Sequence, residues 1–228
     1  MTGMRKPFFS FASVVLAFCC VAVASAQLPP LTFTPVPSGT VVHAESVSFN
    51  GSSADRWEAV VSKKFVGSGN GRSFYQWFLA IYQLRRGAYR LRYESPYNGG
   101  PLSRVTQANG AKMWFPIQDL KVIGAAPLMQ KRVQLLVVQS HEMAADCGSA
   151  TITILGTKPG GAVGPVATVT NSCDLAAKIG SDGTSIELTG PYYGPKAPLC
   201  CPTKPNVTAT LRYVDGKWVE TPSYFKVE

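Results

Sequence analysis

The segment Val207–Glu220 has the pattern of two short strands joined by a tight turn. β-Branched and aromatic residues alternate with polar ones, which is typical of strands with one buried face. The pair Asp215-Gly216 predicts a two-residue type I′ turn, because both central positions of that turn need a positive φ. Tyr213 and Trp218 flank the turn and are expected to pair across it. A hairpin of this kind needs further strands to bury its apolar face.

The remainder of the chain supplies such strands. Short apolar or alternating segments recur between Gly- and Pro-rich turns, and helical periodicity is weak. We therefore expect a mainly β fold, an antiparallel sandwich or a partly open barrel built from short strands and hairpins. Residues 190–202 are predicted to be a loop, because their four prolines would remove ladder donors. The expected strands lie near residues 56–61, 74–84, 89–93, 112–116, 120–123, 133–140, 148–155, 166–170, 175–179 and 185–188, with a short helix as the alternative at 56–61 and a buried helix at 74–84.

The first residues have the features of a leader for export. Arg5 and Lys6 precede an apolar run, and Ala24-Ser25-Ala26 fits a cleavage site for small residues. Residues 1–26 are therefore predicted to be a signal peptide cleaved after Ala26, which leaves no transmembrane anchor. An uncleaved anchor is the alternative.

A further alternative for the leader is lipid attachment at Cys19 or Cys20. The bulky Phe18 just before Cys19 disfavours it. The protein is thus expected to be exported, and to be periplasmic or secreted. Residues 27–40 form a Pro-rich linker, and residues 41–228 form the β domain, either as one unit or as two lobes, 41–155 and 165–228.

Removal of the leader leaves four cysteines, and an even number in an exported chain predicts disulfides. Neighbouring side chains on an extended backbone point to opposite faces, so Cys200 and Cys201 are expected to reach different partners. Cys147 and Cys173 are those partners, and either assignment remains open. A Cys200–Cys201 bond is disfavoured by ring strain. A metal or redox site is disfavoured because the chain has no Cys-x-x-Cys.

The cysteine pair belongs to a longer motif. It combines GP at 190–191, APLCCPT at 197–203 and YVDGK at 213–217. This segment resembles the end of a recurrent exported bacterial β module of unknown function. It is also similar, more loosely, to the LppP/LprE-type lipoproteins of actinobacteria. The resemblance implies an exported, disulfide-bonded β domain and implies no activity.

Two groups of side chains are candidates for binding. Arg85, Arg86, Arg90 and Arg92 lie close in sequence within a chain of net charge +9, which falls to +7 when Arg5 and Lys6 leave with the signal peptide. They form either an anion-binding surface or a solvated strand face. Tyr192 and Tyr193 either stack on a ligand or cover the end of a sheet. Nucleic acid is disfavoured as a partner, since the chain is expected to be exported and lacks a known recognition motif.

Catalytic signals are weak. His141-Glu142 begins a zinc-protease motif, but Ala145 stands where the second histidine is needed. His141 could pair with Cys147, yet that cysteine is better explained by a disulfide. No catalytic residue, metal or cofactor is therefore predicted.

The function expected from these features is a non-enzymatic one. The chain is predicted to bind at the bacterial envelope, or to have a structural or interaction role there, with an envelope component or another exported protein as partner. The alternative is a hydrolase of an envelope polymer that uses paired carboxylates. Its candidate residues are Asp119, Glu142, Asp146, Asp174 and Asp182.

Overall fold

A computed structural model describes residues 39–51, 55–69, 72–94, 104–106, 112–114, 117–130, 132–142, 148–195 and 202–228. These residues form fifteen strands, and no helix occurs among them. The predicted signal peptide, with Cys19 and Cys20, lies outside the described residues, as does the linker up to residue 38. Thr40, placed in the linker by the sequence, is the first residue of β1.

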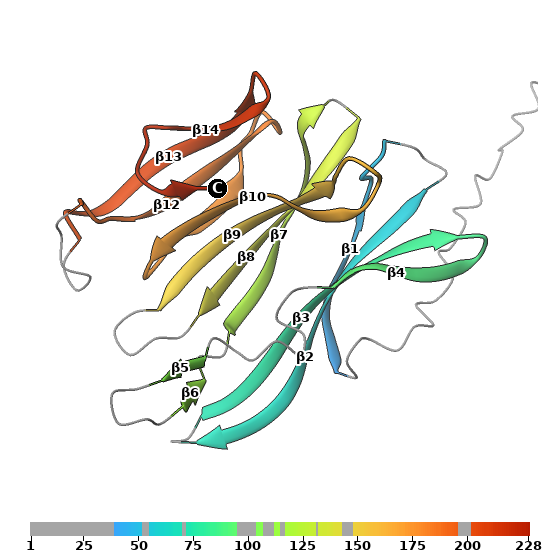
Figure 1. Cartoon of the computed structure of the whole chain (residues 1–228), viewed down its shortest axis with the longest axis horizontal. Coiled ribbons are helices and arrows are strands. Elements are labelled where there is room, and N and C mark those ends of the chain that lie inside the picture. Colours follow the sequence, from blue (N-terminus) through green and yellow to red (C-terminus); the bar gives the residue numbers. More distant parts are fainter. Residues whose placement is uncertain are drawn as a thin grey trace, which may run out of the picture. The chain divides into compact units, whose positions relative to one another are not determined.

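The strands form three main antiparallel sheets (Figure 1). The first has the order β1-β2-β3-β4, the second β15-β10-β9-β8-β7, and the third β11-β12-β13-β14. The first sheet comprises β1 (Thr40–Val47), β2 (Arg56–Gly69), β3 (Arg72–Arg85) and β4 (Ala88–Glu94). The second comprises β7 (Ile117–Gln130), β8 (Val133–Glu142), β9 (Ser149–Thr157), β10 (Val163–Ser172) and β15 (Lys226–Val227). The third comprises β11 (Ala176–Ile179), β12 (Ser185–Tyr192), β13 (Lys204–Val214) and β14 (Lys217–Thr221), and a separate pair comprises β5 (Arg104–Thr106) and β6 (Lys112–Trp114).

The predicted C-terminal hairpin is confirmed. Asp215 and Gly216 have φ values of 49° and 81°, as a type I′ turn requires. Tyr213 is the register partner of Trp218, and their ring centroids lie 5.5 Å apart. The turn chemistry therefore sets the register between β13 and β14.

The predicted loop over residues 190–202 is wrong at its beginning, because β12 continues to Tyr192. The register shifts between Gly190 and Tyr192, which places Pro191 at a β-bulge. A proline at a bulge removes no ladder hydrogen bond, so the strand can pass through it.

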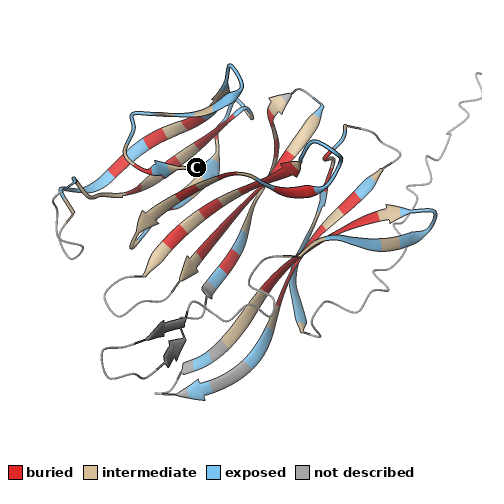
Figure 2. Ribbon diagram, viewed as in Figure 1, coloured by how far each residue is buried: buried red, intermediate tan, exposed pale blue. Residues whose placement is uncertain are grey.

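The second sheet is buried on both faces (Figure 2). Along β8, Leu135 and Val137 belong to one hydrophobic cluster, while Leu136 and Val138 belong to another. The first cluster joins this sheet to the third sheet, and the second joins it to the first sheet. The uninterrupted apolar run of β8 is what a strand in the middle layer requires.

The prediction of a mainly β, antiparallel fold is thus confirmed, and none of the sheets closes into a barrel. The main core contains three sheets, whereas the sequence indicated two. The middle sheet, which contains β8, buries both of its faces, and each face contributes to one of the two large clusters. The predicted boundary between lobes, residues 156–164, contains the turn that joins β9 to β10 of the same sheet. Cys147, Cys200 and Cys201 lie outside the described residues, so the disulfides stay predictions.

Candidate functional site

The four candidate arginines lie on the hairpin formed by β3 and β4. Arg86 and Gly87 form its two-residue turn, with φ values of 52° and 77°, and Arg85 pairs with Ala88. Two consecutive positive φ values define the type I′ geometry that suits the twist of the strands. The turn therefore exposes Arg86 at the tip of an edge hairpin.

Three of these arginines share one face of the hairpin. Gln83 is the register partner of Arg90, and Arg85 lies two residues further along β3. The side chains of Gln83, Arg85 and Arg90 therefore point to the same face. The register shifts between Ile81, which pairs with Tyr93, and Tyr82, which pairs with Leu91. Arg92 is therefore the extra residue of a β-bulge.

The bulge brings Arg92 to Gln83. The Arg92 Nε donates a hydrogen bond to Gln83 Oε1 at 3.0 Å, and Gln83 is only 8% exposed. Because a buried side chain has few alternative rotamers, Gln83 fixes the plane of the Arg92 guanidinium. The sequence missed this role of Gln83, although an amide side chain within the apolar run of residues 74–84 is a signal that it needs a polar partner.

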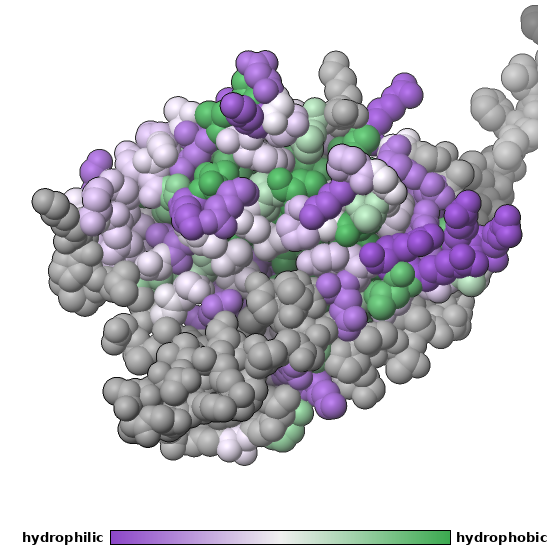
Figure 3. All heavy atoms as spheres, viewed as in Figure 1, coloured by the Kyte–Doolittle hydropathy of each residue, from purple (hydrophilic) through white to green (hydrophobic). Residues whose placement is uncertain are grey.

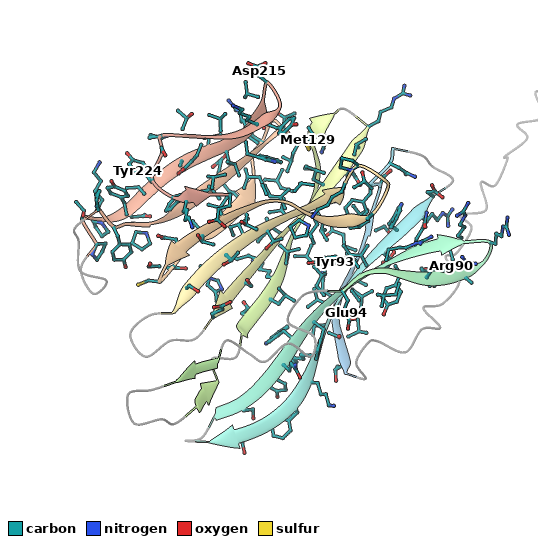
Figure 4. The ribbon with its side chains drawn as sticks, in the orientation of Figure 1. Arg90, Tyr93, Glu94, Met129, Asp215 and Tyr224 are labelled. Carbon is teal, nitrogen blue, oxygen red and sulfur yellow. The ribbon has the colours of Figure 1, made fainter. Side chains whose placement is uncertain are left out.

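The surface around these side chains is strongly cationic. Arg85, Arg86, Arg90 and Arg92 are all exposed, and among the described residues none of them forms a salt bridge. Figure 3 shows hydrophilic side chains gathered over this hairpin, at the right of the view. Figure 4 shows Arg90 on the outer part of the hairpin, beyond Tyr93 and Glu94. Positive charges that no described carboxylate neutralises are available to an anion from solution.

The reverse face of the hairpin is mostly apolar. Leu91 is 41% exposed, and the Tyr89 ring lies against Tyr82 at 6.5 Å between centroids. Burial raises the pKa of Tyr89, the carboxylate of Glu58 adds to this, and Arg56 opposes it. We call the face with Arg85, Arg90 and Arg92 the arginine face, to separate it from this reverse face.

The two candidate tyrosines contact residues of the protein. The Tyr192 ring lies 5.2 Å from the ring of Tyr224 and packs against the cluster between the second and third sheets. The Tyr193 hydroxyl donates a hydrogen bond to Cys173 Sγ at 2.9 Å. Lys204 Nζ lies 5.4 Å from the centroid of the Tyr224 ring. Tyr192 and Tyr193 therefore lie at the end of β12, apart in sequence and in sheet from the arginine face.

His141 and the candidate carboxylates lie elsewhere. His141 Nε2 is 3.5 Å from Asp174 Oδ1 and 3.1 Å from Gln139 Nε2, and its register partner on β7 is Asp119. Glu142 accepts a hydrogen bond from Ser149, at 3.3 Å.

Asp182 forms hydrogen bonds with nearby residues of the protein. Its carboxylate accepts hydrogen bonds from Ser185 Oγ, from the Thr184 N–H and from Arg212, which together hold the pKa of Asp182 below its usual range. Asp146 lies outside the described residues.

The described His, Cys, Asp and Glu side chains are the candidates for holding a metal ion. Within the described ranges, no group of three or more His, Cys, Asp or Glu side chains is placed to hold a metal ion. The same part of the chain contains no helix long and apolar enough to cross a membrane. Among the described candidates, the arginine face is the one that combines exposure, shared orientation and an ordered side chain.

The fold and the arginine face together define an all-β protein of three antiparallel sheets with a cationic edge hairpin. Comparisons with family models, with curated proteins and with solved structures found no match. The resemblance of the C-terminal segment to an exported β module stays a prediction.

Proposed function

We propose that this chain is an exported, non-enzymatic β protein that binds an anionic component of the bacterial envelope through the arginine face. The observation that carries the proposal is the placement of Arg85, Arg90 and Arg92 on one side of the β3–β4 hairpin, exposed and with no salt bridge to a described carboxylate. Positive charges in this arrangement attract an anionic partner and speed its association.

A competing explanation is that the arginines protect an edge strand. β4 is the last strand of the first sheet, and charged side chains on an edge hinder pairing with another chain. This role needs charge but no particular partner. It predicts aggregation when the charges are removed, whereas the binding role predicts a loss of affinity.

The test is a binding titration with two anionic probes, polyphosphate and vesicles that contain phosphatidylglycerol. The variant Arg85→Gln/Arg90→Gln/Arg92→Gln should lose at least tenfold in affinity for both probes at low salt, because each lost ionic contact contributes of the order of 0.5–1 kcal/mol. The matched control is Arg132→Gln/Lys158→Gln/Lys217→Gln, which removes three exposed charges elsewhere. Equal affinities for the two triple variants would refute the proposal.

We also propose that structural disulfides hold the end of the third sheet to the second. The Cys173 N–H donates to the Gly148 carbonyl, at 2.9 Å, next to position 147. Tyr193 contacts Cys173, and the Gly194 N–H donates to Thr203 Oγ1 at 2.9 Å, two residues beyond position 201. These contacts support a meeting of the four cysteine positions at one end of the fold. Each disulfide would contribute about 2–4 kcal/mol, mainly by restricting the unfolded chain.

A non-reducing peptide map of the exported protein, together with its intact mass, tests this proposal and the predicted export. We expect an N-terminus at Gln27, no free thiol, and Cys200 and Cys201 in different bridges. Free thiols at Cys200 and Cys201 would contradict the disulfides, and a lipid on Cys19 or Cys20 would contradict cleavage after Ala26.

The hydrolase is a second candidate, and one observation favours it. Asp174 Oδ1 lies 3.5 Å from the His141 imidazole, and a second proposed carboxylate, Asp119, is the register partner of His141. A turnover assay on purified envelope polymers tests it. Activity that disappears in Asp119→Asn and in Asp174→Asn would support the hydrolase and count against the non-enzymatic role.

A further inference from the structure

Arg92 differs from an ordinary surface arginine because a hydrogen bond orients its guanidinium. Its Nε is occupied by the hydrogen bond to Gln83 Oε1, and in a planar guanidinium the end-on pair of N–H groups, one on each terminal nitrogen, then points away from the buried glutamine. Two parallel N–H donors match a pair of oxygens on a phosphate or a carboxylate. A β-bulge that re-aims a side chain in this way is common next to functional sites.

The neighbouring charges extend this donor pair into a wider cationic surface. Arg90 lies on the same face two residues away, and Arg85 lies across the hairpin near its tip. Two carboxylates flank this segment in the sequence. Glu58 lies on the reverse face of the sheet, and Glu94 lies at the inner end of β4. The arginine face is therefore suited to several phosphates that lie in one plane.

The reverse face of the hairpin indicates which phosphate-bearing partner fits. Leu91 is a large apolar side chain left 41% exposed on an edge strand, directly behind the arginines. A soluble polyanion would contact the arginine face alone. A membrane surface that meets the hairpin along its free edge would contact both faces, with phosphates at the arginines and acyl chains at Leu91.

We infer that the β3–β4 hairpin is a membrane-contacting element in which Arg92, oriented by Gln83, binds the phosphate of an anionic phospholipid headgroup and Leu91 inserts beside it. This inference rests on the proposed function and names the partner of the same site. It assigns Gln83 a positioning role, because Gln83 acts through Arg92 and is itself buried.

The experiment compares single variants of the full exported protein on two kinds of vesicle and on polyphosphate. Vesicles of phosphatidylcholine with phosphatidylglycerol provide the anionic surface, and vesicles of phosphatidylcholine alone provide the neutral one. Gln83→Leu removes the acceptor without changing the charge, and Arg92→Lys keeps the charge but loses the paired donors. Each should lower affinity for the anionic vesicles by about three- to tenfold, as the loss of a charge-assisted hydrogen bond predicts.

Arg132→Lys is the matched control for the Arg92 change, since Arg132 is exposed on another hairpin. It should bind as the unchanged protein does. Thermal unfolding of every variant checks that the fold is kept. Because Arg92→Lys leaves the buried glutamine in place, it tests the donor pair even if Gln83→Leu fails to fold.

Leu91→Gln separates a lipid from a soluble polyanion. It should lower affinity for the anionic vesicles by roughly fivefold, because part of a leucine side chain no longer leaves water, and it should leave affinity for polyphosphate unchanged. If Leu91→Gln has no effect on vesicles, or if the protein binds polyphosphate but no vesicle, the phospholipid inference is wrong while the proposed function stands. If Arg92→Lys and Gln83→Leu both bind as well as the unchanged protein, the role of the oriented Arg92 is wrong. If the unchanged protein binds neither probe, the proposed function itself fails.

Discussion

Glu220 shows how one carboxylate organises the end of the chain. Its oxygens accept hydrogen bonds from the backbone N–H groups of Tyr224 and Phe225, at 3.0 and 3.1 Å. Phe225 is 7% exposed and belongs to the cluster between the second and third sheets. Glu220 therefore fixes the turn that returns Phe225 to the core. Burial nevertheless raises the pKa of Glu220, and these two backbone hydrogen bonds oppose the rise.

We predict that Glu220→Ala destabilises the protein by about 1–3 kcal/mol, because two partly buried N–H groups lose their acceptor. Glu220→Gln keeps one acceptor oxygen and should cost less than half as much. Urea unfolding of the two variants measures the difference. Equal losses would show that the hydrogen bonds contribute little and that the side-chain stem matters more.

Glu58 provides a prediction about pH. It is half-buried on β2 and accepts a hydrogen bond from Ser46 Oγ at 3.0 Å. Burial raises the pKa of Glu58 above its ordinary value of 4.5, the hydrogen bond from Ser46 opposes this, and Glu45 adds to it. A carboxyl group with a raised folded pKa reduces stability once it ionises.

Glu58→Gln should therefore raise the melting temperature at neutral pH, since the amide removes the charge and keeps an acceptor for Ser46. Below about pH 4.5, the ordinary value, the carboxyl group is protonated in both states and the gain should disappear. Calorimetric melting at several pH values tests this. If the rise in melting temperature persists at low pH, its cause is a change in packing and not the ionisation of Glu58.

At the scale of elements, β8 contributes side chains to both of the large hydrophobic clusters. Leu135 and Leu136 point to opposite faces, and their exposed fractions are 2% and 0%. β14 is the opposite case, an edge strand on which Val219 is 43% exposed. The energetic effect of an apolar side chain should follow this difference.

Leu135→Ala and Leu136→Ala should each cost about 2–5 kcal/mol, because each leaves a cavity in a different cluster. Val219→Ala should stay within about 0.5 kcal/mol. Chemical unfolding monitored by tryptophan fluorescence measures all three. A small effect of one leucine would mean that its cluster relaxes around the cavity.

Sequence patterns predicted the elements better than their assembly. The Asp215-Gly216 turn and the strand over residues 133–140 depend on local chemistry, and the structure confirms both. The number of sheets depends on whether a strand buries one face or two, and an apolar run such as that of β8 is equally compatible with several layers. Pro191 was misleading, because a proline at a bulge and a proline in a loop look alike in sequence.

The candidate site was only partly predictable. The cluster Arg85, Arg86, Arg90 and Arg92 is visible in the sequence, and strand alternation places Arg90 and Arg92 on one face. The partnership of Arg92 with Gln83 depends on a bulge and on register, and no local signal gives either of these. The contacts of Tyr192 and Tyr193 depend on the third sheet and on the C-terminal turn in the same way.

At the scale of the whole molecule, the two large clusters end before the tip of the β3–β4 hairpin, and a smaller cluster of Val60, Ala80 and Tyr82, with Tyr89 packed against it, lies on the reverse face. Ile81 belongs to the cluster between the first and second sheets, whereas Arg85, Arg90 and Arg92 beyond it are exposed. The inner end of the β3–β4 hairpin is thus packed in the layered core, whereas its outer end, with the arginines, is exposed to solvent. A packed base with an exposed cationic edge strand is the arrangement that the proposed binding through this hairpin needs.

Hydrogen exchange of the purified protein, with and without vesicles containing phosphatidylglycerol, tests the proposed binding through this hairpin most directly. Peptides that cover residues 85–94 should gain protection on the vesicles, because the free edge of β4 is then shielded from water. Peptides that cover the β13–β14 hairpin, residues 207–221, whose turn at Asp215-Gly216 is also exposed, should exchange as before. Protection of the second hairpin alone, or of neither, would contradict binding through the arginine face.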